Sequence, residues 1–112
     1  MTTTTFQVST YQYYNFSSRS SGKTVIILKG TGGEICYIHF EDNPTAALPR
    51  AEQTSKKSYV FHYHHSQLQH LIDMLRNEKP ITVIYDNDPV ANNSIISTSA
   101  EPVGEGEEAG FE

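Results

Sequence analysis

One segment of the chain has the spacing of an amphipathic helix, and it lies among segments that are typical of strands. Its apolar residues recur at i, i+3, i+4 and i+7, on one helical face; they are Leu68, Leu71, Ile72 and Leu75. Ser66 followed by Gln69 predicts a capping box at the start. Pro80 predicts the end, because proline has no N–H to donate and restricts the residue before it. We predict one helix, about residues 67–78.

Most of the remaining sequence is rich in Thr, Val, Ile, Tyr and Phe, which favour strands. Apolar or alternating runs predict strands at 6–16, 24–29, 34–41, 59–65, 81–85 and 93–99. The nearly continuous apolar run at 24–29 indicates a central strand covered on both faces. Gly30–Gly33 supplies the positive φ that a hairpin turn needs. A change of side-chain parity near Thr10 predicts a bulge in the first strand.

These elements predict one small α+β domain over residues 1–100, in the order β-β-β-β-α-β-β. A chain of 112 residues is too short for several cores. We expect a curled antiparallel sheet, or an OB-like barrel, of five or six strands with the helix packed on an open face or end. The arrangement resembles an OB-like barrel, with one strand more before its helix. Segment 42–58 is long for a connection, so it is either a functional loop or partly disordered.

Features of the sequence that report on the compartment indicate a cytoplasmic protein. Cys36 is the only cysteine, which excludes an intramolecular disulfide framework. Met1 is followed by four threonines, so the start lacks a signal-peptide pattern. No run approaches the roughly 18 apolar residues of a membrane span, and we expect no contact with membranes. Because Cys36 lies inside a predicted strand, we expect its thiol to be inert packing.

Charge is distributed unevenly between the body and the end of the chain. Residues 1–100 carry eight basic and eight acidic side chains, whereas residues 101–112 hold five glutamates and no basic residue. The neutral body lacks the basic balance of duplex-binding proteins. Residues 101–112 are predicted to be a flexible acidic tail, in which Glu107, Glu108 and Phe111 form a candidate docking peptide. This tail is similar in style to those of bacterial single-strand DNA-binding proteins, without their Asp-rich, Pro-Phe ending.

Three histidines form a candidate metal site. His62 and His64 are two residues apart on a predicted strand and therefore share a face. If the strand of His39 lies alongside, three imidazole nitrogens could meet, as zinc favours. The sequence contains no HExxH or Cys–His signature. The competing interpretation, which we favour, is a polar strand face exposed to water.

Signals for catalysis and for nucleotide binding are absent. Gly30–Gly33 follows a strand but leads into another strand, with no Lys-Ser/Thr, so it does not predict a phosphate-binding loop. Asp86 and Asp88 are explained by a turn. We therefore expect no catalytic residue, no cofactor and no enzymatic activity.

Aromatic and basic side chains lie close together along the chain and indicate a binding surface. The candidate binding residues are Tyr11, Tyr13, Tyr14, Arg19, Lys56, Lys57, His62, Tyr63 and His64. We expect a non-enzymatic protein-interaction module that binds a protein partner or a second copy of itself, as a homodimer, through a Tyr/His-rich sheet face. The first alternative is a single-stranded nucleic-acid binder whose acidic tail is regulatory. The second is a metal-binding protein using His39, His62 and His64.

Overall fold

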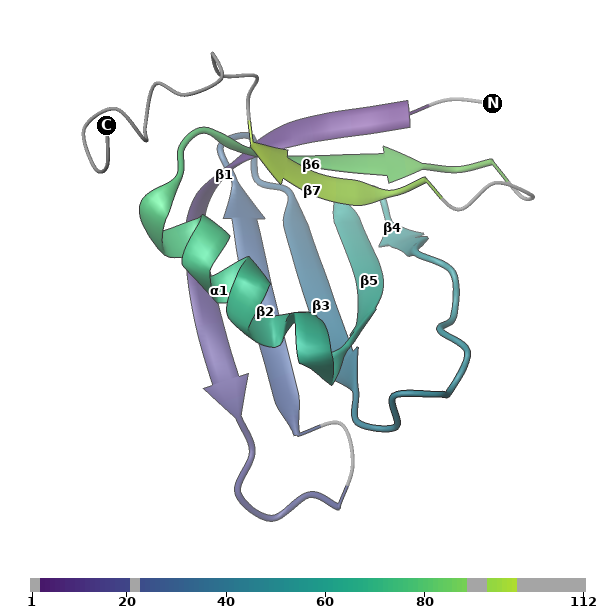
Figure 1. Cartoon of the computed structure of the whole chain (residues 1–112). Helices are drawn as coiled ribbons and strands as arrows, with labels where there is room; N and C mark the ends of the chain where they lie inside the picture. Colours follow the sequence, from purple (N-terminus) through teal and green to yellow (C-terminus); the bar gives the residue numbers. More distant parts are fainter. Residues whose placement is uncertain (1–2, 21–22, 89–92, 99–112) are drawn as a thin grey trace, which may run out of the picture.

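The computed structural model describes residues 3–20, 23–88 and 93–98. These residues form seven strands and one α-helix, preceded by a short 3-10 turn, η1 (His65–Gln67) (Figure 1). The strands are β1 (Thr3–Asn15), β2 (Thr24–Gly30), β3 (Ile35–Glu41), β4 (Glu52–Ser55), β5 (Ser58–His64), β6 (Ile81–Asp86) and β7 (Ile95–Thr98), and the helix is α1 (Leu68–Asn77). The α+β class is as predicted. Candidate tail residues Glu107, Glu108 and Phe111 lie outside the described residues.

All seven strands belong to one sheet, in the order β4-β5-β3-β2-β1-β6-β7. β3 and β5 are parallel, and every other neighbouring pair is antiparallel. The expected curled antiparallel sheet or OB-like barrel of five or six strands therefore differs from the structure in strand number and in sheet type, since the sheet is mixed. The chain between β3 and β5 returns to the starting end of β3 before β5 begins, and such a return is what a parallel neighbour requires. The order has two end strands, β4 and β7, rather than the closed ring of a barrel.

The additional strand lies in the segment that the sequence predicts as a loop. β4 occupies Glu52–Ser55 and pairs with β5 in an antiparallel hairpin. Its side chains are all exposed, so no apolar alternation marks it in the sequence. Tertiary pairing with β5, rather than local propensity, makes this segment a strand.

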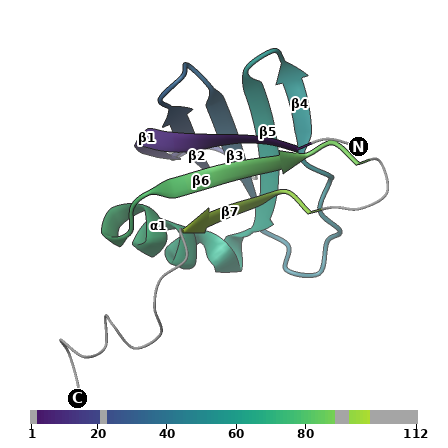
Figure 2. The same ribbon diagram turned by 90° about the horizontal axis from the view of Figure 1, so that it is seen from above.

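A bulge in β1 lets one strand serve both halves of the sheet. Residues 3–7 pair with β6, whereas residues from Val8 onward pair with β2, and the register shifts between Val8 and Thr10. Ser9 is the extra residue, and its hydroxyl donates to the Lys29 carbonyl (3.0 Å). A bulge bends and twists its strand, and here it turns β6 and β7 over the same side of the sheet as α1 (Figure 2).

Helix α1 begins and ends within one residue of the predicted limits, but its start is stabilised differently. Gln67 at the N-cap makes no side-chain capping bond. The Gln69 Nε2 instead donates to Asp73 Oδ1 (2.9 Å), one turn further along. The predicted capping box between Ser66 and Gln69 is therefore wrong, because Gln69 reaches forward along the helix rather than back.

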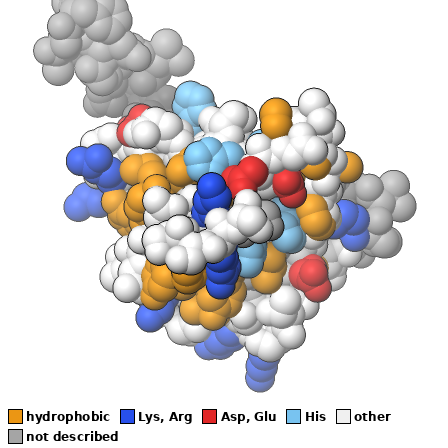
Figure 3. Space-filling view, turned by 90° about the horizontal axis from the view of Figure 1, so that it is seen from below, with side chains coloured by type: hydrophobic (Ala, Val, Ile, Leu, Met, Phe, Trp, Pro, Cys, Tyr) orange, Lys and Arg blue, Asp and Glu red, His pale blue; other side chains and the backbone are white. Residues whose placement is uncertain are grey.

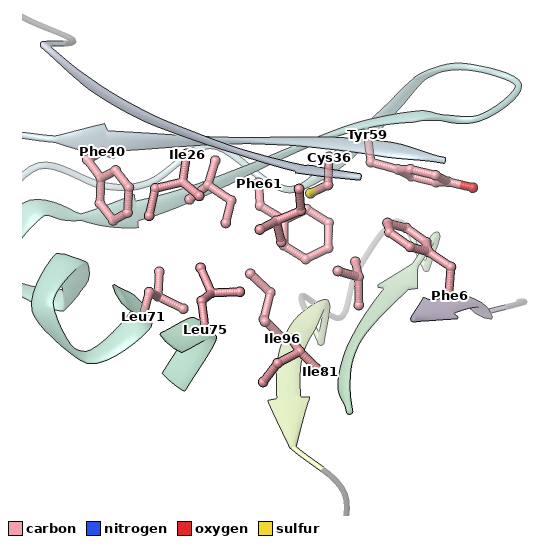
Figure 4. Packing of buried hydrophobic residues seen from close by; sticks show 13 residues of the cluster. Phe6, Ile26, Cys36, Phe40, Tyr59, Phe61, Leu71, Leu75, Ile81 and Ile96 are labelled. Carbon is pink, nitrogen blue, oxygen red and sulfur yellow. The ribbon is translucent and has the colours of Figure 1, made fainter. Parts of the chain in front are cut away.

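The core lies between one side of the sheet and the layer formed by α1, β6 and β7 (Figure 4). Its buried members are Phe6, Ile26, Leu28, Cys36, Ile38, Phe40, Tyr59, Phe61, Leu71, Leu75, Ile81, Val83 and Ile96. Leu71 and Leu75 are buried, and Leu68 and Ile72 pack against the same cluster. The apolar stripe of the helix is thereby confirmed as its core-facing side.

The Gly30–Gly33 hairpin joins β2 to β3 as predicted. Gly33 has φ = +89°, in the left-handed region that side chains with a Cβ rarely adopt. The Gly30 N–H donates to the Glu34 carbonyl (2.8 Å). Lys57 Nζ, from the turn between β4 and β5, donates to the Gly32 carbonyl (2.6 Å). The turns of the two hairpins are therefore linked at one end of the sheet.

No helix among the described residues is long and apolar enough to cross a membrane.

Candidate interaction surface

One face of the sheet has no helix or strand packed on it among the described elements. Side chains alternate between the two faces of a strand, and residues paired across neighbouring strands point to the same side. Figure 2 shows α1 and β7 together on one side of β2, β3 and β5. The opposite side, which we name the open face, comprises Thr10, Gln12, Tyr14, Val25, Ile27, Lys29, Ile35, Tyr37, His39, Glu52, Ser58, Val60 and His62.

The centre of the open face is apolar. Ile27, Tyr37 and Val60 are consecutive in one row across β2, β3 and β5, and each is half-buried. Val25, in the adjacent row, is only 7% exposed. The sequence predicts that the 24–29 strand is covered on both faces, but the described helix and strands pack on only one of them. Val25, on the other face, is nevertheless buried by its neighbours. Apolar side chains left on an uncovered sheet face are typical of a surface that receives a partner.

Two histidines form a pair on the open face beside this apolar row. His39 and His62 are direct partners in the parallel ladder of β3 and β5. Their ring centroids are 5.8 Å apart, with an angle of 30° between the ring planes. His39 is exposed and His62 is half-buried. Burial and the neighbouring His39 lower the pKa of His62, while the Glu52 carboxylate opposes this shift. The pair therefore favours neutral imidazole at His62.

The third histidine of the candidate metal site has a different partner. A ring nitrogen of His64 is 2.8 Å from the Ala46 carbonyl oxygen. This bond holds the connection after β3 against the end of β5. The described residues contain no group of three or more His, Cys, Asp or Glu side chains that could hold a metal ion. The structure thus brings together His39 and His62 from the predicted set, and places His64 at a separate contact.

The aromatic candidates of β1 are divided between the two faces. Tyr14 is on the open face, 39% exposed, and its ring lies 6.1 Å from that of Phe16. The Arg19 guanidinium carbon lies 3.8 Å from the centroid of Phe16. Tyr11 and Tyr13 point to the helix side, where Tyr11 packs against the core and Tyr13 is 48% exposed. A single Tyr-rich face of β1 is therefore not formed.

The remaining candidates lie at the edges. Lys56 and Lys57 occupy the turn between β4 and β5, at one end of the sheet. Tyr63 points to the helix side and packs against the core. Burial raises the pKa of Tyr63 to about 12, although a backbone hydrogen bond from Ile96 acts in the other direction. That bond connects β5 with the end strand β7, next to a pocket of ≈ 250 Å³.

Charges of both signs surround the apolar centre. Lys29 on β2 and Glu52 on β4 are exposed members of the open face. Figure 3, which views the molecule from one end of the strands, shows histidines among hydrophobic side chains and charges of both signs. The face therefore has no single-sign field that would select a strongly charged ligand.

Cys36 is not part of this surface. Its side chain is fully buried on the helix side, and burial raises the pKa of its thiol to about 12. A thiol that stays protonated at neutral pH is a poor nucleophile. The prediction that Cys36 serves as packing is in agreement with this position.

Sequence reasoning identified His39, His62 and Tyr14 but missed the aliphatic centre of the open face. Val25 and Ile27 were assigned to a doubly covered strand, and Tyr37 and Val60 were not singled out. The available signal was the alternation in β3 and the first half of β5, where every second residue is buried and the residues between are not. Comparison with protein-family models, with curated proteins and with solved structures gave no match.

Proposed function

We propose that this protein is a non-enzymatic interaction module that binds a second copy of itself through the open face. The observation that carries the proposal is the apolar row of Ile27, Tyr37 and Val60 on a sheet face that no described helix or strand covers. Burying such a row against a partner removes apolar surface from water, at about 25 cal/mol per Å². The half-buried imidazoles beside it suit a partly wet contact.

A second copy is the partner that the charge distribution favours. Because the open face carries both Lys29 and Glu52, its charges balance. Two open faces can therefore pack against each other without a large net repulsion. Symmetric pairing of identical patches is also the most common way in which soluble chains associate. A strongly basic or acidic partner would gain little from this surface.

The size of the open face predicts that the dimer is weak. The four longer strands of the open face are β1, β2, β3 and β5; spaced about 4.8 Å apart, with about seven residues each, they present roughly 450 Å² in projection. Stable interfaces bury about 800 Å² on each partner. We therefore expect a dimer that dissociates on dilution, with a dissociation constant in the micromolar range or weaker.

A charge placed in the apolar row tests this proposal. Sedimentation velocity over a dilution series is expected to show self-association of the wild type and a monomer at every concentration for Ile27→Lys. Gln69→Lys, on the exposed side of α1, adds the same charge elsewhere and is expected to associate as the wild type does. A wild type that remains monomeric at millimolar concentration, or an Ile27→Lys variant that associates unchanged, would refute the proposal.

Single-stranded nucleic acid is the second candidate, and the cluster of Tyr14, Phe16 and Arg19 is the observation that favours it. Single-strand binding proteins use aromatic side chains, on which bases stack, together with arginine. The described residues nevertheless carry eight basic and eight acidic side chains, so the field that attracts phosphates is weak. Salt-sensitive binding of a labelled oligonucleotide, lost in Tyr14→Ala, would favour this candidate over self-association.

A further inference from the structure

We propose that His39 and His62 together bind one divalent transition-metal ion, of the class of Cu²⁺, Ni²⁺ or Zn²⁺, on the open face. Imidazole nitrogen is a preferred ligand for all three ions. Both ligands come from one chain, so the site can form in the monomer whether or not the protein self-associates.

The separation of the two rings is close to what a shared ion requires. An imidazole nitrogen binds zinc at about 2.0–2.1 Å, so two rings on one tetrahedral ion have centroids about 5 Å apart. The rings of His39 and His62 are 5.8 Å apart, at 30° to one another. Because His39 is exposed, we expect its side chain to rotate so that a nitrogen of each ring faces one ion. The backbone already supplies the spacing, since the two residues are direct partners in the ladder.

The surroundings favour a cation at this position. Glu52 on the adjacent edge strand acts electrostatically on His62, and its negative charge also favours a bound metal ion. Val25, the partner of His39 in β2, is almost fully buried. The half-buried His62 has less rotational freedom than an exposed side chain, which lowers the entropy cost of binding.

The chain supplies two histidine ligands rather than three because its other histidines lie away from the pair. His64 is engaged with the Ala46 carbonyl, and His65 and His70 lie in the turn and the helix that follow β5. Water molecules complete the coordination shell when one chain binds. Two imidazoles fixed on neighbouring strands bind more tightly than either alone, because the second contact is intramolecular. Among the three ions, Cu²⁺ is expected to bind most tightly.

Calorimetric titration of the full-length, untagged and metal-free chain with Cu²⁺ tests the site. The wild type is expected to bind one equivalent at the pair. H39N and H62N are each expected to weaken this event by roughly 10²-fold, because each leaves a single imidazole. H70N, which removes an exposed imidazole from α1, is the matched control and is expected to bind as the wild type does. Circular dichroism of each variant establishes that the fold is retained.

Electron paramagnetic resonance provides a second readout at the metal itself. Nitrogen hyperfine structure from two equivalent imidazoles is expected in the wild type, and from fewer in H39N. Unchanged binding in both H39N and H62N, or an equal loss in H70N, would overturn the proposal. Repeating the titration with Ile27→Lys separates the two proposals, since this variant is expected to lose self-association and to keep the metal site.

Discussion

Adjacent residues on β3 and β5 have opposite roles, because side chains alternate between the core and the open face. Phe61 is 2% exposed, whereas the next residue, His62, contributes to the open face. The same alternation makes Cys36 part of the core and Tyr37 part of the apolar row. A substitution on these strands therefore affects either stability or binding according to its parity.

The buried thiol of Cys36 and the largely buried phenol of Tyr63 predict that the free energy of unfolding declines in alkaline solution. Burial raises the Cys36 pKa from 9.0 to about 12 and the Tyr63 pKa from 10.0 to about 12. Between pH 9 and 12 the unfolded chain has lost protons that the folded chain retains, so the free energy of unfolding falls as pH rises. Urea unfolding at pH 8 to 11 measures this slope. Cys36→Ala is expected to have a shallower slope than the wild type between pH 9 and 10, and an identical slope would contradict the account.

At the scale of elements, the sequence predicts most clearly what local chemistry determines. The stripe of Leu71 and Leu75 and the stop before Pro80 predict α1, and the glycines of 30–33 predict the β2–β3 hairpin. The bulge is also predicted to within a residue, because the parity of β1 changes there. β4 could not be predicted, since its four polar residues have no pattern of their own and are a strand only through their pairing with β5.

The β2–β3 hairpin offers a direct test of this local encoding. Gly33→Ala forces a Cβ into a backbone conformation with φ = +89°, and we expect the free energy of unfolding to fall by about 1 kcal/mol. Thr31→Ala, in the same turn, leaves an ordinary φ and is expected to change it by less than about 0.5 kcal/mol. Chemical denaturation measures both variants. Equal effects of the two substitutions on the free energy of unfolding would show that the positive φ at Gly33 does not determine the loss of stability.

At the scale of the whole molecule, the main consequence of the fold is a sheet that the described helix and strands cover on one side only. The bulge in β1 sends β6 and β7 to the side that α1 already occupies, and no described helix or strand packs on the half-buried apolar row of the other side. Sequence periodicity shows that β3 and β5 have two different faces, but not which one the helix takes. To predict the open face, one must know that β3 and β5 are parallel neighbours. That pairing depends on the path of the segment between them, and the sequence of this segment does not specify the path.

The most direct test of the open face as the self-association surface is a dilution series followed by backbone amide NMR. The amide signals of Ile27, Tyr37 and Val60 are expected to shift with concentration, while those of Gln69 and Asp73 on the exposed side of α1 stay constant. Signals that shift on the helix and not on the open face, or that do not shift up to millimolar concentration, would contradict the account.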